Sequence, residues 1–278
     1  LLAAACSSQA DTAETTEPAQ NTSFDIELIE VASELEFPWG MAALPGGEML
    51  VTEREGRLRI LRDGALDPTP ISGLPEDMYI DRQGGLLDVA LHPDFEANRL
   101  VYLTYSQGTR QANRTVLIRG ALNSSGTALE GVEEVFAAHT PEKEGGGHFG
   151  SRIAFMSDGS LIVTTGDGFA WMDETQETNN HFGKVLRMSD DGQPLPDNPR
   201  YDEGGPAQFV WSIGHRNVLG LAYSADTGIL YAHEHGPKGG DELNIIEPGT
   251  NYGCPVITYG VNYDGTIITN ETEREGMA

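Results

Sequence analysis

Basic side chains are scarce in this chain. Of its 278 residues, only 17 are lysine or arginine, whereas 43 are aspartate or glutamate, so the formal net charge is −26. Proteins that bind nucleic acid or anionic membranes usually carry a basic patch, and too few positive residues are present here to form a dominant one. The composition therefore excludes nucleic-acid binding as the main function.

Cysteine and long apolar runs are also lacking. The two cysteines, Cys6 and Cys254, cannot form a disulfide framework, and no run of 18 or more apolar residues is present that could span a membrane. In contrast, 38 % hydrophobic residues are enough to bury a core. The 34 glycines and 15 prolines indicate many turns, which favours an all-β chain.

The chain begins with a short apolar segment, residues 1–6, that ends in small residues. It is typical of the end of a secretory signal, and it resembles the bacterial lipoprotein signal, in which the cysteine becomes lipidated. Ala3 stands where that signal prefers Leu, and an accidental Ala-rich start is the alternative. Residues 7–23 contain no large apolar side chain, so we expect a flexible tether. We therefore expect an exported protein, either periplasmic or lipid-anchored at Cys6.

The ordered part is expected over residues 24–278, beginning with a strand because residues 25–31 alternate between polar and apolar. A pattern of strand, turn and strand then occurs four times, and it contains equivalent residues at spacings of 47, 64 and 68. These equivalent residues are Leu44, Leu91, Phe155 and Tyr223. Recurrent hairpins lengthened by loop insertions are typical of a β-propeller, although regular hairpins alone also fit a β-sandwich. The sequence predicts about four blades, and residues 263–265 resemble the start of a further hairpin.

Loops of a propeller converge at one end of its central channel, so residues that are distant in sequence can meet there. Gln83, beside a Gly-Gly pair, offers both a donor and an acceptor to a ligand. His148 directly follows three glycines and can act as a general base, although a lone histidine is as often structural. Arg216 and Asn217 could hold a carboxylate or quinone oxygen, or Arg216 could simply pair with an acidic side chain.

Hard oxygen ligands lie in a fourth segment, residues 234–244. The carboxylates of Asp241 and Glu242 follow a backbone bent by glycine and proline, a combination that suits Ca²⁺. His233 and His235 could suggest zinc, but no third nitrogen or sulfur ligand stands at a usual spacing.

The combination of motifs resembles the soluble PQQ-dependent sugar dehydrogenases, the glucose/sorbosone dehydrogenase family of six-bladed propellers, and in particular its aldose sugar dehydrogenase branch. The matching segments occur in family order at residues 38–41, 83–87, 92–95, 147–152, 214–217, 234–244 and 251–253. The resemblance implies a C-terminally truncated member that contains about four of the six blades. One departure is Cys254, because the family usually has Trp at that position.

The resemblance also implies roles for the residues at matched positions. His148 would be the base that takes the proton from the anomeric hydroxyl of the sugar. Contacts to PQQ are implied for Gln83, Arg216, Asn217 and Tyr263. Calcium ligands are implied for the backbone carbonyls of Gly236 and Pro237, and at a second, structural Ca²⁺ for Glu242 and Tyr252.

Three functions therefore remain open from the sequence. The leading hypothesis is a PQQ- and Ca²⁺-dependent oxidation of aldose sugars to lactones, with the electrons passed to an external acceptor. A propeller that binds a partner without redox chemistry is the second, and a propeller hydrolase or lactonase is the third, because His with Ca²⁺ can activate water. The joint presence of Gln83, His148 and Arg216 with the Gly236-Pro237 turn favours the first.

Overall fold

The computed structural model describes residues 26–141 and 143–278, which belong to two units, Leu1–Val31 and Ala32–Ala278. In the first unit, residues 26–31 form no strand, and Ile26 and Leu28 are exposed. The strand expected over residues 25–31 is therefore wrong for its described part. Alternation alone does not make a strand, since each strand needs a neighbour that satisfies its backbone. The expected signal segment and tether lie outside the described residues.

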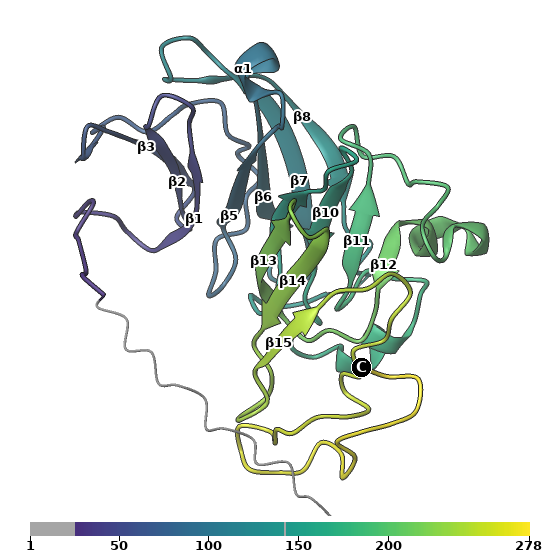
Figure 1. Ribbon diagram of the computed structural model, residues 1–278. Helices are drawn as coiled ribbons and strands as arrows, with labels where there is room; N and C mark the ends of the chain where they lie inside the picture. Colours follow the sequence, from purple (N-terminus) through teal and green to yellow (C-terminus); the bar gives the residue numbers. More distant parts are fainter. Residues whose placement is uncertain (1–25, 142) are drawn as a thin grey trace, which may run out of the picture. The chain divides into compact units, whose positions relative to one another are not determined.

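From Ala32 onward the described chain is all-β and forms a propeller with four blades, each an antiparallel sheet of consecutive strands (Figure 1). The first blade contains β1 (Pro38–Ala43), β2 (Met49–Glu53), β3 (Arg57–Arg62) and β4 (Ala65–Leu66). The second contains β5 (Leu86–Leu91), β6 (Leu100–Gly108), β7 (Asn113–Leu122) and β8 (Leu129–Ala137).

The third blade contains β9 (Ile153–Phe155), β10 (Leu161–Thr164), β11 (Val185–Met188) and β12 (Val210–Ser212). The fourth contains β13 (Val218–Ser224), β14 (Ile229–Glu234) and β15 (Glu242–Ile245). The four hairpins expected from the sequence are thus confirmed as the first two strands of each blade. The expected hairpin near Asp264 is a turn closed by isolated bridges.

Helical structure in the described residues is limited to segments of three to five residues. They are α1 (Phe95–Asn98), η1 (Met172–Gln176), η2 (Tyr201–Glu203) and η3 (Gly205–Phe209). None of these helices has the length and apolar character needed to cross a membrane.

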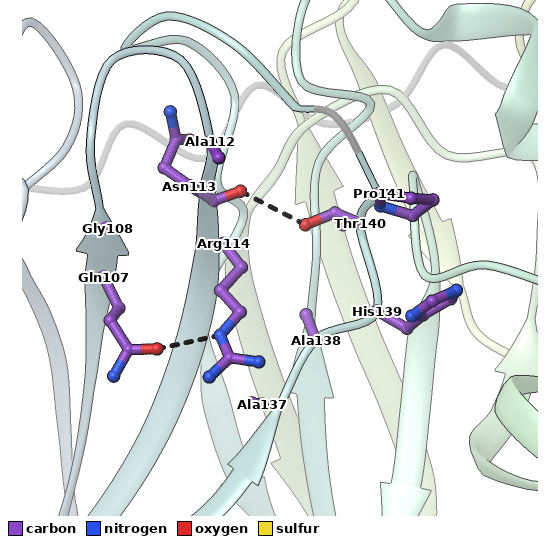
Figure 2. A pocket seen from close by; sticks show the side chains of 10 residues that line it. All are labelled: Gln107, Gly108, Ala112, Asn113, Arg114, Ala137, Ala138, His139, Thr140 and Pro141. Carbon is purple, nitrogen blue, oxygen red and sulfur yellow. Dashed lines mark hydrogen bonds between the residues drawn. The ribbon is translucent and has the colours of Figure 1, made fainter.

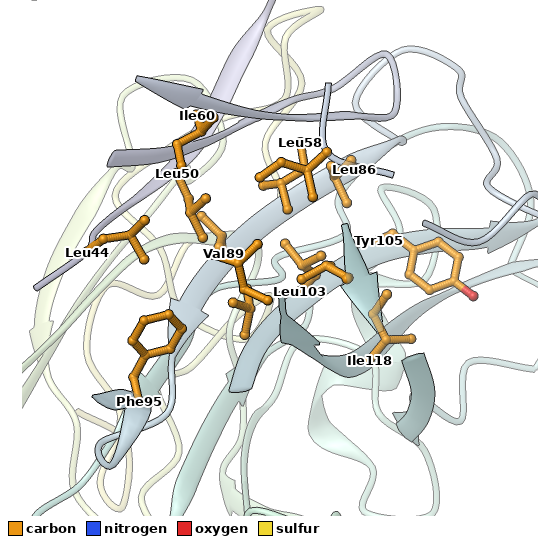
Figure 3. Close-up of a cluster of buried hydrophobic side chains, with 14 of the residues drawn as sticks. Leu44, Leu50, Leu58, Ile60, Leu86, Val89, Phe95, Leu103, Tyr105 and Ile118 are labelled. Atoms are coloured by element: carbon orange, nitrogen blue, oxygen red, sulfur yellow. The ribbon is translucent and has the colours of Figure 1, made fainter. Parts of the chain in front are cut away.

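The first strand of each blade is its inner strand, and the inner strands lie side by side. β5 contacts both β1 and β9, and β9 contacts β13. The core fills the space between neighbouring blades because alternate side chains of a strand point to opposite faces. On β6, Leu103 packs toward the first blade, as Figure 3 shows, whereas Tyr102 belongs to the cluster shared with the third blade.

One hydrogen-bond arrangement is repeated at all three blade junctions. It uses a completely buried threonine on the second strand of a blade: Thr52, Thr104 or Thr164. Each hydroxyl accepts a backbone N–H from the inner-strand region of its own blade, at 2.8 to 3.0 Å. It also donates to a backbone carbonyl at the start of the next blade, that of Leu87, Ser151 or Val218. The hydroxyls therefore fix adjacent inner strands to one another.

The second of these junctions can be tested by Thr104→Val, which keeps the shape but removes the hydroxyl. The substitution leaves the Ser151 carbonyl and the Asp88 N–H without their partner in a buried environment. We expect the free energy of unfolding to fall by about 1–3 kcal/mol, measured by urea denaturation. Thr69→Val, at an exposed position, is the matched control. Equal stability of the two variants would contradict the proposed contribution of the junction.

Candidate active site

The sequence-predicted side chains come from loops that immediately precede the inner strands. Gln83 lies before β5, His148 before β9, and Arg216 before β13. Because these strands are neighbours, the three loops meet. The Gln83 side-chain carbonyl accepts the backbone N–H of His148 at 2.7 Å, and the Gln83 N–H donates to the Gly146 carbonyl at 2.9 Å. The first two loops are thus joined directly.

The imidazole of His148 is buried and oriented by a carboxylate. Its Nδ1 lies 2.6 Å from Oδ1 of Asp167, and only 4 % of the residue is exposed. A carboxylate can only accept, so the hydrogen bond places the proton on Nδ1 and leaves the lone pair on Nε2. Nε2 has no hydrogen-bond partner within the described part of the chain and is not among its fully buried unpaired atoms. The geometry is that of a general base.

Asp167 was not identified from the sequence. Its N–H donates to the Arg216 carbonyl at 2.7 Å, which joins the loop after β10 to the third site loop. Its Oδ2 is buried without a partner among the described residues. The available signal was a carboxylate between two glycines directly after the cleanest repeat. Gly166 is required there, because a Cβ atom would lie 2.5 Å from the His148 carbonyl oxygen.

A buried lysine, also missed in the sequence, lies close to this pair. The Lys143 ammonium donates to Oδ1 of Asn113 at 2.7 Å and lies 3.7 Å from the centre of the Phe149 ring. Burial lowers the pKa of Lys143 to about 7, and the negative charge of Asp167 partly opposes this shift. Lys143 therefore changes charge near neutral pH beside the candidate base.

Asn113 also lines an open pocket between the β6–β7 turn and residues 138–141 (Figure 2). Its backbone carbonyl accepts the Thr140 hydroxyl at 3.4 Å there. None of the sequence-predicted site residues lines this pocket, so it does not contribute to the candidate active site.

Arg216 connects the base to the fourth blade. Its Nη1 donates to the carbonyls of His235 at 2.8 Å and Gly236 at 2.6 Å, and its guanidinium carbon lies 5.7 Å from the centre of the Tyr263 ring. Its remaining side-chain donors make no hydrogen bond within the described residues and are not fully buried. They are free for an anionic ligand.

Asn217 is held inside the site and is almost completely buried. Its Oδ1 accepts the Gly150 N–H at 3.1 Å, on the loop that carries His148. Tyr263, in contrast, is 64 % exposed, and within the described residues its ring meets the group at Arg216. The structure thus brings together all five residues predicted for the base and for PQQ, with Tyr263 at the margin.

The predicted calcium carbonyls line a pocket together with acidic side chains. Gly236, Pro237 and Glu242 line it, and so do Asp167, Arg216 and Glu234. The Gly236 carbonyl accepts Nη1 of Arg216, and the Pro237 carbonyl accepts the Gly240 N–H at 2.8 Å. Each carbonyl oxygen has two lone pairs, so one acceptor position remains on both. The carbonyl and carboxylate oxygens in this pocket are ligands of the type that Ca²⁺ prefers.

Glu234 begins the segment 234–244, but the sequence alone predicts no role for it. Its buried carboxylate accepts from His215 Nδ1 at 2.9 Å and from the backbone N–H of Arg216. It lies directly opposite Glu242 on the neighbouring strand. Burial raises the pKa of Glu242, and the Glu234 charge adds to this effect. Glu234 thus fixes the backbone at Arg216 and places a second carboxylate beside Glu242.

Tyr252, the other residue predicted for a structural Ca²⁺, is separate from this pocket. Its hydroxyl donates to the Ile245 carbonyl at 2.6 Å and accepts the Glu247 N–H at 2.9 Å. It does not line the pocket that contains Glu242. The described residues also contain no group of three or more His, Cys, Asp or Glu side chains that could hold a metal ion.

Cys254, where the family usually has Trp, packs into the same region. Burial raises the pKa of its thiol well above the ordinary value. Its carbonyl accepts the Gln176 side-chain amide at 2.7 Å. The thiol is therefore poorly suited to nucleophilic chemistry, since the thiolate is the reactive form.

Burial of Lys143 makes the stability of the chain depend on pH. Its pKa is about 7 in the folded chain and 10.5 ordinarily, so the folded state binds fewer protons between these values. Stability is therefore lost as pH falls from 10.5 toward 7, and no more is lost below that range. The stability of wild type relative to Lys143→Met should rise by about 1.4 kcal/mol per pH unit in this window. Urea denaturation at several pH values measures the difference. A stability difference that does not change with pH would contradict this expectation.

Two known proteins are similar in sequence to this chain. Over 256 residues the chain is 45 % identical to the uncharacterized protein slr1608 of Synechocystis, covering 86 % of this chain and 61 % of that protein. Over 243 residues it is 37 % identical to the aldose sugar dehydrogenase YliI of Escherichia coli, covering 87 % and 64 %. The chain thus spans less than two thirds of the length of these relatives.

A solved structure supports the same relation. The PQQ-bound form of the aldose sugar dehydrogenase of Streptomyces coelicolor superposes with a TM-score of 0.72 at 35 % identity, over 86 % of this chain and 70 % of that one. The family model for glucose/sorbosone dehydrogenases matches residues 35–278. The chain therefore belongs to the glucose/sorbosone dehydrogenase family.

Proposed function

We propose that this chain forms part of a PQQ- and Ca²⁺-dependent dehydrogenase that oxidises aldose sugars to lactones and passes the electrons to an external acceptor. The observation that carries the proposal is the buried His148–Asp167 pair, with Nε2 of His148 unpaired, next to a pocket that contains Arg216. A similar protein is named an aldose sugar dehydrogenase, and its solved structure is of the PQQ-bound form. This similarity supports the proposal.

The residues present fit such a cofactor. PQQ is a planar quinone with carboxylate groups, and when bound it supplies the quinone that accepts a hydride. The unpaired donors of Arg216 would hold its oxygens and stabilise negative charge. Gln83 and Asn217 would fix the base loop beside it, and Tyr263 would contact it at the margin. The free lone pairs of the Gly236 and Pro237 carbonyls would hold Ca²⁺.

The proton is handled by the histidine. Nε2 of His148 accepts the proton from the anomeric hydroxyl as the hydride leaves the same carbon, which yields the lactone from a cyclic aldose. The Asp167 carboxylate keeps the imidazole in the tautomer that presents this lone pair, and it stabilises the imidazolium that forms. Burial strengthens this interaction because little water competes with it.

We also propose a location for the protein. The apolar start and the polar segment that follows it support export, with the protein either periplasmic or lipid-anchored at Cys6. Metabolic labelling with a palmitate analogue would test the anchor, with Cys6→Ser as the control. Unlabelled wild-type protein would contradict the anchor.

Reconstitution of the full-length protein tests the proposed activity. Addition of PQQ and Ca²⁺ should produce sugar-dependent reduction of an artificial acceptor dye with at least one member of a panel of aldoses. Chelation of Ca²⁺ should abolish the activity, and Ca²⁺ should restore it. No dye reduction with any sugar, together with no binding of PQQ, would overturn the proposal.

Removal of the base should separate binding from turnover. We expect His148→Ala to retain PQQ and to lose turnover by roughly 10²–10⁴-fold, because a positioned base contributes about that much. PQQ affinity can be measured by fluorescence titration and turnover by dye reduction. Wild-type turnover in this variant would exclude His148 from the mechanism.

A further inference from the structure

An exposed aromatic side chain lies beside the candidate base. Phe169 is 52 % exposed, although the eight residues that precede it in the chain are all buried. Its ring centre lies 5.1 Å from that of His148, with the two planes at 75°, so the rings meet edge to face. Part of a large apolar side chain is thus open to solvent at the site where the proton is to be removed.

The backbone holds Phe169 there in an unfavourable conformation. Its φ is +74°, in the left-handed region that is unfavourable for residues other than glycine. Its N–H donates at 2.7 Å to Oδ1 of Asp167, the same oxygen that orients His148. Gly147 leaves room for it, because a Cβ atom on Gly147 would lie 3.1 Å from Cβ of Phe169. Local strain of this kind is characteristic of functional sites.

These contacts place the aromatic ring beside the imidazole that would receive the proton of a sugar hydroxyl. Nδ1 of His148 is occupied by Asp167, so a substrate hydroxyl has to approach Nε2. A sugar bound at Nε2 would lie near the exposed ring of Phe169, because the two ring centres are only 5.1 Å apart. A pyranose has apolar faces made of C–H groups, and an aromatic ring binds such faces by dispersion and by burial of apolar surface.

We propose that Phe169 is a specificity-determining residue that forms the apolar wall of the sugar subsite and holds the C–H face of an aldopyranose against His148. This inference rests on the proposed sugar oxidation. The wall favours sugars that present an uninterrupted C–H face, and it disfavours those that present an axial hydroxyl to the ring. Phe169 acts by positioning the sugar, since the proton itself goes to His148.

The test compares Phe169→Ala and Phe169→Leu with wild type in the full-length protein loaded with PQQ and Ca²⁺. Ile245→Ala is the matched control, because Ile245 is similarly exposed at 54 %. For glucose we expect Phe169→Ala to raise KM by up to about tenfold, with kcat changed by less than about threefold and PQQ affinity unchanged. The KM of Phe169→Leu should lie between those of wild type and Phe169→Ala. The preference for glucose over galactose, which has one axial hydroxyl, should shrink in Phe169→Ala.

A binding measurement without turnover completes the test. 1,5-Anhydroglucitol lacks the anomeric hydroxyl, so its dissociation constant measured by ligand-observed NMR reports the subsite alone. It should weaken in Phe169→Ala and stay unchanged in Ile245→Ala. Unchanged sugar binding and KM, or a loss confined to PQQ affinity, would overturn the role of Phe169 and leave sugar oxidation intact. A wild-type protein that oxidises no aldose would overturn both.

Discussion

The repeated hydrogen bond between blades is the constraint on which the site depends. A blade of this size cannot bury both of its faces alone, so the propeller is held together at the junctions between blades. The hydroxyls of Thr52, Thr104 and Thr164 each join two inner strands, and all three are fully buried. Because a buried carbonyl without a partner is costly, each junction has one preferred register.

That register determines where the functional side chains lie. The carbonyl acceptors of Leu87, Ser151 and Val218 come four, three and two residues after Gln83, His148 and Arg216, respectively. Each inner strand is therefore anchored at a point only a few residues after a side chain of the candidate site. The strained backbone at His148 and Phe169 persists because the surrounding blades hold it. Hydrogen bonds to Gln83 and Asn217 thus hold the loop that carries His148.

The sequence predicted the four hairpins because each consists of alternating strands around a glycine-containing turn, which are local signals. It also located Gln83, His148 and Arg216, because glycines or neighbouring polar residues mark their loops. Asp167 and Lys143 were missed, since their importance comes from contacts with residues that are distant in the chain. The strand expected at residues 25–31 was wrong in its described part, because pairing is a non-local property that alternation does not reveal.

The few positive charges of this acidic chain include two at the site. Lys143 and Arg216 are both buried near Asp167, whereas most of the carboxylates lie outside the candidate site. We propose that Asp167 makes His148 a base with its lone pair on Nε2. Asp167→Asn measured in the PQQ- and Ca²⁺-loaded protein tests this most directly, because the amide can impose the opposite tautomer. PQQ affinity should stay within about threefold of wild type, and kcat should fall by roughly 10²–10⁴-fold. An unchanged kcat in a folded, PQQ-loaded variant would contradict this role of Asp167.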